Sequence, residues 1–167
     1  MRVTGERDVG RTGLRALLPP RPDAGGDTPW AAVEGTSDEQ PLVVIADDSR
    51  DFRALVRFEL EHERFRVEEA ATGEEALDAV HRFQPDLLLL DLSMPDVDGW
   101  DVLKQLRCGG CPVGMRVAVL TGDADEMVEQ RAQAAGAAAY LAKPISGRDL
   151  ARALRRLAPA HAAIGVA

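Results

Sequence analysis

The chain has 167 residues, a formal net charge of -8 at pH 7, 46% hydrophobic residues and only 4% aromatic residues. This length suits one domain with a mainly aliphatic core. The acidic balance disfavours direct DNA binding and attachment to anionic membranes. Two cysteines do not make a disulfide framework, and we find no apolar run of transmembrane length and no signal-peptide core. We therefore expect a cytoplasmic protein that does not bind membranes.

The two ends of the chain differ in composition from its middle. Residues 1–40 contain clusters of Pro and Gly, as in LLPPRPDAGGDTP, without sustained helical or strand periodicity. This composition predicts a disordered N-terminal tail. The last predicted helix ends at Leu157, and the ten residues after it are too few for a helix-turn-helix or a catalytic domain. We expect one folded domain over residues 41–158 and a short C-terminal tail over 159–167.

From Pro41 onward, strand and helix patterns alternate five times. Short apolar runs predict strands at 42–46, 65–70, 87–90, 115–120 and 137–142. The second run is the weakest and is expected at the edge of the sheet. Helical spacing follows each strand: after Ser49 as a cap, after a Thr72/Glu75 capping box, over 100–107, up to Gly136, and over 146–157. The pattern predicts an α/β fold, a doubly wound parallel sheet with helices on both faces.

Polar residues stand where the predicted strands end. Asp47 and Asp48 follow the first strand, Asp91 the third, Thr121 the fourth and Lys143 the fifth. Parallel strands bring these residues to one edge, where open α/β sheets bind ligands. Two like charges about 4 Å apart cost about 4 kcal/mol at an effective dielectric near 20, and Mg²⁺, which prefers carboxylates, water and phosphate oxygens, would relieve that repulsion. The pattern indicates phosphoryl transfer onto a carboxylate.

The segments VIADDS, LLLLDLSMPDVDG, VLTG and YLAKP follow one another on successive strand ends. Through these segments, residues 41–158 resemble the receiver domain of bacterial two-component response regulators, of the stand-alone, single-domain type. The resemblance implies a flavodoxin-like strand order, 2-1-3-4-5. It also implies a protein that is not an enzyme beyond its own phosphorylation and dephosphorylation, and that switches its binding to a downstream protein partner.

The resemblance assigns the phosphorylation site and the metal ligands. Asp91 would accept a phosphoryl group from a sensor histidine kinase or from a phosphotransfer protein of a phosphorelay, in a reaction that depends on Mg²⁺. Asp48, Asp91 and the backbone carbonyl of Ser93 would bind the ion directly. Asp47 would act on it through water.

The resemblance also assigns residues that respond to the phosphoryl group. Lys143 would pair with its oxygens, and Thr121 would move to hydrogen-bond one of them. Tyr140 occupies the position of an aromatic switch and would swing inward when Thr121 moves. The bond between Lys143 and Pro144 is expected to be cis.

Two other functions fit parts of the sequence. A phosphatase of the haloacid-dehalogenase kind also uses an aspartate after a buried strand, but it needs a second aspartate as general acid where this chain has Ser93. A pseudo-receiver would bind partners without phosphorylation. The complete set of acidic, hydroxyl and lysine residues argues against that hypothesis.

Two further groups of residues have both a structural and a functional interpretation. Arg50, Arg53 and Arg57 have the spacing of a solvated helix face, and they also border the site at which a kinase would dock. Cys108 and Cys111 have the CxxC spacing of redox and metal sites, without a second cysteine pair and without a helix starting there. We interpret them as two free thiols in a loop at the opposite end of the sheet from Asp91.

Overall fold

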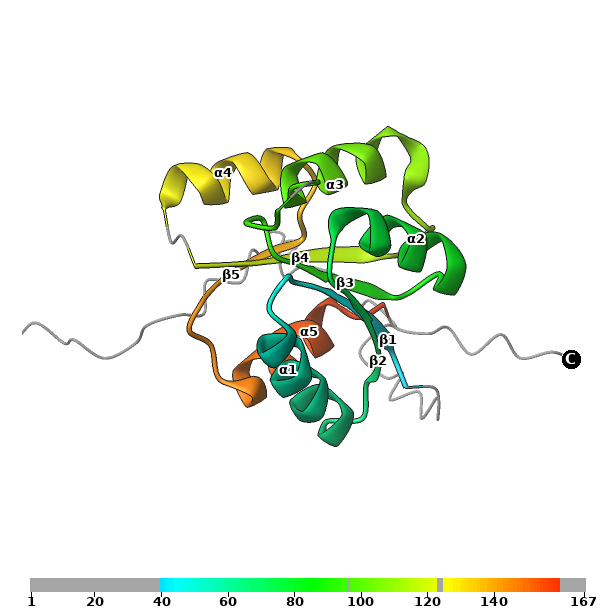
Figure 1. Ribbon diagram of the computed structural model, residues 1–167, viewed down its shortest axis with the longest axis vertical. Helices are drawn as coiled ribbons and strands as arrows, with labels where there is room; N and C mark the ends of the chain where they lie inside the picture. The colour runs from blue at the N-terminus through cyan, green and yellow to red at the C-terminus, as the bar shows by residue number, and fades with distance from the viewer. Residues whose placement is uncertain (1–39, 96, 123–124, 160–167) are drawn as a thin grey trace, which may run out of the picture.

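The computed structural model describes residues 40–95, 97–122 and 125–159 (Figure 1). Apart from Gln40 and Pro159, the two predicted tails lie outside these residues. The described part contains one five-stranded parallel sheet in the order β2-β1-β3-β4-β5, which confirms the expected strand order. The strands are β1 (Leu42–Ala46), β2 (Arg66–Ala70), β3 (Leu87–Leu90), β4 (Arg116–Thr121) and β5 (Ala139–Ala142).

Helices cover both faces of the sheet, as predicted. Figure 1 shows α1 (Arg50–His62) and α5 (Gly147–Leu157) on one face, and α2 (Gly73–Phe83), α3 (Gly99–Gln105) and α4 (Glu126–Ala134) on the other. Side-chain oxygens cap these helices at their first turns. The Ser49 hydroxyl accepts a hydrogen bond from the amide of Phe52, and the Thr72 hydroxyl accepts one from Glu75. The Glu75 carboxylate accepts the amide of Ala71, one residue earlier than in the standard capping box.

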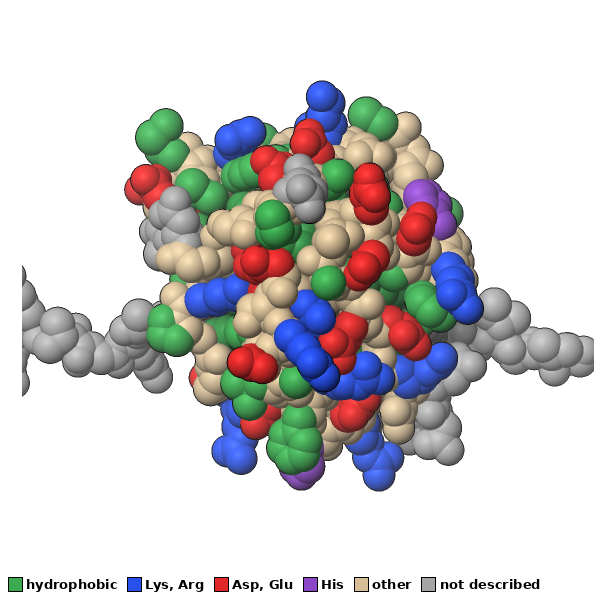
Figure 2. Space-filling model, viewed as in Figure 1, with side chains coloured by type: hydrophobic (Ala, Val, Ile, Leu, Met, Phe, Trp, Pro, Cys, Tyr) green, Lys and Arg blue, Asp and Glu red, His purple; other side chains and the backbone are tan. Residues whose placement is uncertain are grey.

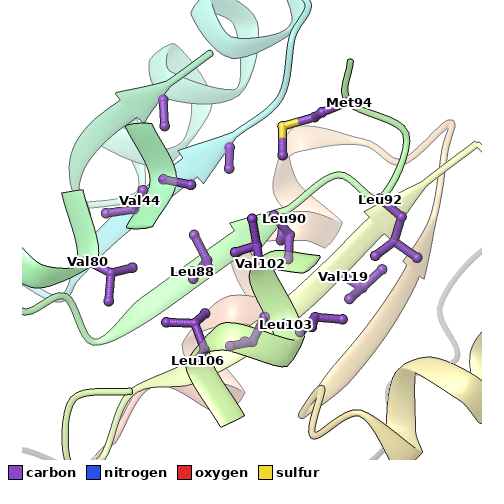
Figure 3. Close-up of a cluster of buried hydrophobic side chains, with 14 of the residues drawn as sticks. Val44, Val80, Leu88, Leu90, Leu92, Met94, Val102, Leu103, Leu106 and Val119 are labelled. Carbon is purple, nitrogen blue, oxygen red and sulfur yellow. The ribbon is translucent and has the colours of Figure 1, made fainter. Parts of the chain in front are cut away.

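The four consecutive leucines of β3 are buried because the strand has helices on both sides. Leu88 and Leu90 belong to the core that α2, α3 and α4 cover, where Val102 and Leu103 of α3 lie above the sheet (Figure 3). Leu87 and Leu89 belong to the second core, under α1 and α5. All four leucines are at most 1% exposed. Because each buried leucine contributes about 1.5–3 kcal/mol, this short strand is a firm support for the residue that follows it.

The end of α3 differs from the prediction. The sequence predicts a helix over 100–107 and a loop that contains both cysteines, but α3 passes directly into a wide helical turn, η2 (Leu106–Gly110). Cys108 therefore lies in a helical turn, and Cys111 is the first residue after it. Gly109 breaks the turn with a φ of 116°, a backbone conformation that glycine adopts without a steric penalty.

Gly99 allows α3 to begin directly on the end of β3. A Cβ atom at Gly99 would lie 2.4 Å from the backbone oxygen of Asp91 and 2.6 Å from the Cα of Leu92. Both of these atoms belong to the backbone and cannot rotate away. The Asp98 carboxylate caps the helix by accepting the amide of Asp101 at 2.9 Å. The turn after Asp91 therefore requires a residue without a side chain at position 99.

We expect Gly99→Ala to lower the free energy of unfolding by about 1–3 kcal/mol, the usual cost of forcing an extra methyl group into a packed site. Urea denaturation measures this change. Gly122→Ala is the matched control, because no atom of the described residues lies within 4 Å of a Cβ built at Gly122. Equal destabilisation by the two substitutions would contradict the close-approach argument.

Candidate functional site

The register of the sheet brings two aspartates side by side. Ala46 of β1 pairs with Leu90 of β3, so Asp47 and Asp91 are the next residues on neighbouring strands. Both side chains are buried, with residue exposures of 2% and 6%, whereas Asp48 is exposed. One carboxylate oxygen from each of these three residues lies within 4.8 Å of the other two. The structure thus gathers the three predicted carboxylates at one point of the sheet edge.

Lys143, the residue after β5, reaches the same point of the sheet edge. Thr121 of β4 pairs with Ala142 of β5, and the amide of Lys143 donates a hydrogen bond to the carbonyl of Thr121 at 2.8 Å. The ammonium Nζ donates to Asp47 Oδ2 at 2.6 Å and to Asp91 Oδ2 at 2.8 Å. The peptide bond between Lys143 and Pro144 is cis, as the resemblance implies. One lysine therefore bridges the two buried carboxylates.

The other oxygens of these carboxylates accept backbone hydrogen bonds. Asp47 Oδ1 accepts the amide of Ser49 at 2.8 Å, and Asp91 Oδ1 accepts the amide of Ser93 at 2.9 Å. Each bond closes a short turn from an aspartate to the amide two residues later. The two turns fix the orientation of both carboxylates. Ser93 itself is exposed, and its carbonyl as a metal ligand stays a prediction.

Burial and charge act against one another in this cluster. Burial raises the pKa of Asp47, and repulsion from Asp91 raises it further, although hydrogen bonds from Lys143 and Ser49 oppose both effects. Burial also disfavours the charge of Lys143, but its hydrogen bonds to Asp47 and Asp91 outweigh this and raise its pKa. Three carboxylates and one ammonium leave a formal charge of -2. Hard oxygen donors at this spacing, with uncompensated negative charge, fit a small divalent cation such as Mg²⁺.

Thr121 and Tyr140, the two predicted switch residues, are both buried, with exposures of 1% and 4%. Thr121 is the last residue of β4 and therefore lies at the same sheet edge as Asp91. Tyr140 pairs with Val119 in the β4–β5 ladder and belongs to the core on the α4 side of the sheet. Tyr140 is thus already covered in this structure. Its coupling to a movement of Thr121 stays a prediction.

Two residues of α1, Phe52 and Arg53, contact the site in ways that the sequence did not reveal. The ring of Phe52 lies under Lys143, with Nζ 4.2 Å from the ring centroid. Arg53 donates from Nη1 to the backbone oxygen of Asp47 at 2.7 Å and from Nε to Glu69 of β2 at 3.2 Å. Helical spacing places both residues one turn after the cap, but it does not reveal which groups they contact.

The interpretation of the arginines as a solvated helix face is wrong for Arg53, whose side chain is 12% exposed, whereas the Arg57 side chain is 41% exposed. Arg57 bonds Glu69 and Glu61 at 2.9 and 2.8 Å, and with Arg53 it ties α1 to β2. Arg50 is exposed and fits the simple interpretation. Figure 2 shows basic and acidic side chains interspersed over the part of this face where α1 and β2 lie.

The raised pKa of Asp47 predicts how stability depends on pH. The folded protein holds this proton more tightly than the unfolded chain, so the free energy of unfolding falls as the pH rises from the ordinary pKa of 3.8 through the folded value. Asp47→Asn keeps the shape of the side chain but cannot ionise, so its free energy of unfolding does not fall in this way as the pH rises. In EDTA, we expect its free energy of unfolding to increase relative to the wild type between about pH 4 and pH 7.

Urea denaturation at several pH values measures this difference, and Asp51→Asn makes the same chemical change at an exposed position of α1. A difference between Asp47→Asn and the wild type that stays constant with pH would show that burial of Asp47 does not penalise its charge.

Comparisons with known proteins agree with the geometry. The family described as response regulator receiver domain matches residues 43–155. The chain is 30% identical over 117 residues to sporulation initiation phosphotransferase F of Bacillus subtilis, which covers 70% of this chain and 93% of that protein. It is 39% identical over 117 residues to response regulator MprA of Mycobacterium tuberculosis, covering 69% of this chain and 49% of MprA. The chain therefore spans about half the length of the MprA proteins.

Solved structures show the same fold. The chemotaxis protein CheY4 of Vibrio cholerae has 28% identity and a TM-score of 0.67, covering 71% of this chain and 99% of CheY4. The receiver domain of the putative response regulator NarL of M. tuberculosis has 30% identity and a TM-score of 0.65, covering 71% and 95%. Within the residues that the structure describes, no helix has the length and apolar character to cross a membrane. The chain belongs to the response regulator receiver domain family of two-component systems, whose members interact with histidine kinases or phosphotransfer proteins.

Proposed function

We propose that Asp91 accepts a phosphoryl group from a phosphohistidine of a sensor histidine kinase or phosphotransfer protein, in a reaction that requires Mg²⁺. The observation that carries this proposal is the position of the Asp91 carboxylate, 2.8 Å from the Lys143 ammonium and within 4.8 Å of Asp47 and Asp48. A carboxylate oxygen forms a bond to phosphorus while the bond between phosphorus and the imidazole nitrogen breaks. The imidazole leaves with the electron pair and takes up a proton. The receiver supplies position and charge.

The surrounding residues suit the charge of the incoming group. Asp47, Asp48, Asp91 and the carbonyl of Ser93 would hold Mg²⁺, which when bound offsets the negative charge of the phosphoryl oxygens. Lys143 has a flexible stem and three donors, so it can keep a carboxylate and also donate to a phosphoryl oxygen. The bound ion and Lys143 would thus together offset the negative charge of the added phosphoryl group.

We further propose that the protein acts as a single-domain response regulator, which passes its state to a partner protein. The match to the B. subtilis phosphotransferase over 93% of that protein supports a domain that works alone. The MprA relatives, about twice as long as the matched region, carry additional chain. Either a diffusible effector or a phosphorelay carrier fits this proposal.

The alternative phosphatase hypothesis has less support. A haloacid-dehalogenase mechanism needs a carboxylic acid at position 93, where this chain has an exposed serine whose amide is bonded to Asp91. The family match also favours the receiver. Phosphorylation itself decides between the receiver and the pseudo-receiver.

Incubation with acetyl phosphate and Mg²⁺ should add one phosphate to the wild type, as seen by intact mass spectrometry. Asp91→Asn should add none. Omission of Mg²⁺, or Asp48→Ala, should slow the reaction about a hundredfold or more, because a bound ion supplies several kcal/mol of charge stabilisation. Phosphate on Asp91→Asn would show that the site is misassigned. A wild type that never gains phosphate, yet binds a partner, would be a pseudo-receiver.

The predicted switch depends on the hydroxyl group of Thr121. A phosphoryl oxygen would give it a charged acceptor, a bond worth about 1.5–3 kcal/mol, which shifts a two-state population about ten- to a hundredfold. With beryllofluoride and Mg²⁺, we expect amide hydrogen exchange to slow in β5 and α4 and to stay unchanged in α2. Thr121→Ala should lose this protection, and Thr121→Ser, which retains the hydroxyl, should keep it. Equal protection in all three proteins would mean that the signal takes another route.

A further inference from the structure

Two thiols stand at the edge of the sheet opposite Asp91, where phosphoryl transfer does not use them. Cys108 lies in η2 and Cys111 directly after it, before β4 begins at Arg116. Both cysteines are free and exposed. Figure 1 shows that the connection from α3 to β4 lies at the far end of the sheet from the start of α1. The pair is therefore spatially separate from the carboxylate site.

The backbone between the thiols can adjust to join them. Cys108 and Cys111 are three residues apart, and the positive φ of Gly109 takes the chain between them out of a regular helix. A disulfide needs their Cβ atoms at about 3.5–4.5 Å. Only glycines lie between the two cysteines. Gly109 has a φ of 116° and open space around it, whereas a Cβ built at Gly110 would lie 3.3 Å from the backbone oxygen of Gln105. The open surroundings of Gly109 make this residue the place where the backbone between the two thiols can rotate.

Open space adjoins one of the two thiols. A mainly apolar groove of about 210 Å³ runs between α3, β4 and the end of α4, and Arg107 and Cys111 both line it. The groove gives the Cys111 side chain open space on one side. Burial raises the pKa of the Cys111 thiol, which lowers its thiolate fraction and slows its own attack on a disulfide in solution.

We propose that Cys108 and Cys111 form a redox-active dithiol that small-molecule disulfides, such as oxidised glutathione, convert to an internal disulfide. The Cys108 thiolate attacks one sulfur of the oxidant, the bond between its two sulfurs breaks, and one glutathione leaves as a thiolate. The Cys111 thiolate then attacks Cys108 Sγ and releases the second glutathione. Two protein thiols lose two electrons and two protons, and one oxidised glutathione becomes two reduced molecules.

The segment that carries the two thiols also contacts α4, so oxidation of the thiols affects this helix. Arg107, next to Cys108, donates from Nη1 to the backbone oxygen of Ala134 at 2.7 Å, in the last turn of α4. The guanidinium of Arg131 in α4 lies 4.0 Å from the ring centroid of Trp100 in α3. Closing the disulfide shifts the backbone that carries Arg107 and changes how α4 rests on α3.

The first test uses the reduced full-length chain, equilibrated with mixtures of reduced and oxidised glutathione and analysed by intact mass. The wild type should lose two hydrogens, with the internal disulfide at least about tenfold more abundant than any glutathione adduct, because the second exchange is intramolecular. Cys111→Ser should stop at one glutathione adduct. Cys108→Ser should form its adduct more slowly. Accumulation of adducts in the wild type, or no reaction at all, would overturn the proposal.

The second test follows α4 through the fluorescence of Trp100, in a Trp30→Phe background that removes the other tryptophan. Oxidation should change this emission in the parent. Arg107→Gln should form the disulfide equally well and lose most of the change. Thiol oxidation that leaves Trp100 emission unaltered in the parent would overturn the link to α4. Circular dichroism of each variant shows that it is folded, and the result does not depend on phosphorylation of Asp91.

Discussion

The ammonium group of Lys143 between the carboxylates of Asp47 and Asp91 is the interaction on which the arrangement of the sheet edge depends. Two buried carboxylates about 4 Å apart would repel by about 4 kcal/mol at an effective dielectric near 20, and the lysine offsets that cost with hydrogen bonds of 2.6 and 2.8 Å. The three groups come from the ends of β1, β3 and β5. A slip of one residue in any of these strands would turn a charged group toward the core. The charge balance and the register therefore stabilise one another.

The rest of the structure falls into a firmly packed part and a more weakly attached part. Asp91 follows four fully buried leucines, and Gly99 lets α3 begin against its backbone. In α4, by contrast, Ala132 is the buried residue, Val128 packs against the core from a partly buried position, and Arg131 contacts Trp100 of α3. A reacting carboxylate needs a fixed position, whereas an element that signals needs a second arrangement close in free energy. The distribution of packing suits both requirements.

Much of this organisation was predictable because it depends on local patterns. Apolar runs located the five strands, hydroxyl residues marked the starts of helices, and the position of Asp91 after LLLL placed it at the reactive edge. Strand order was not contained in the periodicity and came from the resemblance to the receiver family. The contact between Phe52 and Lys143 could not be predicted, because it depends on how α1 docks on the sheet. The wide turn at η2 was missed because the sequence does not show that Gly109 takes a positive φ inside a helical segment.

The two chemistries that we assign to the chain meet at α4. In our proposals, the carboxylate site would act on α4 through Thr121 at the end of β4, and the thiol pair would act on it through Arg107, which bonds the last turn of the helix. Besides the apolar packing of Val128 and Ala132, α4 is held by a cation–π contact with α3 and by a hydrogen bond from η2, each worth about 0.5–1.5 kcal/mol. A charged hydrogen bond at Thr121, worth about 1.5–3 kcal/mol, is of comparable size. Neither phosphorylation nor thiol oxidation can therefore hold α4 in one position by itself. Because both free energies act on α4, oxidation of the thiols would change the phosphorylation level at which α4 responds. It would not take the place of phosphorylation.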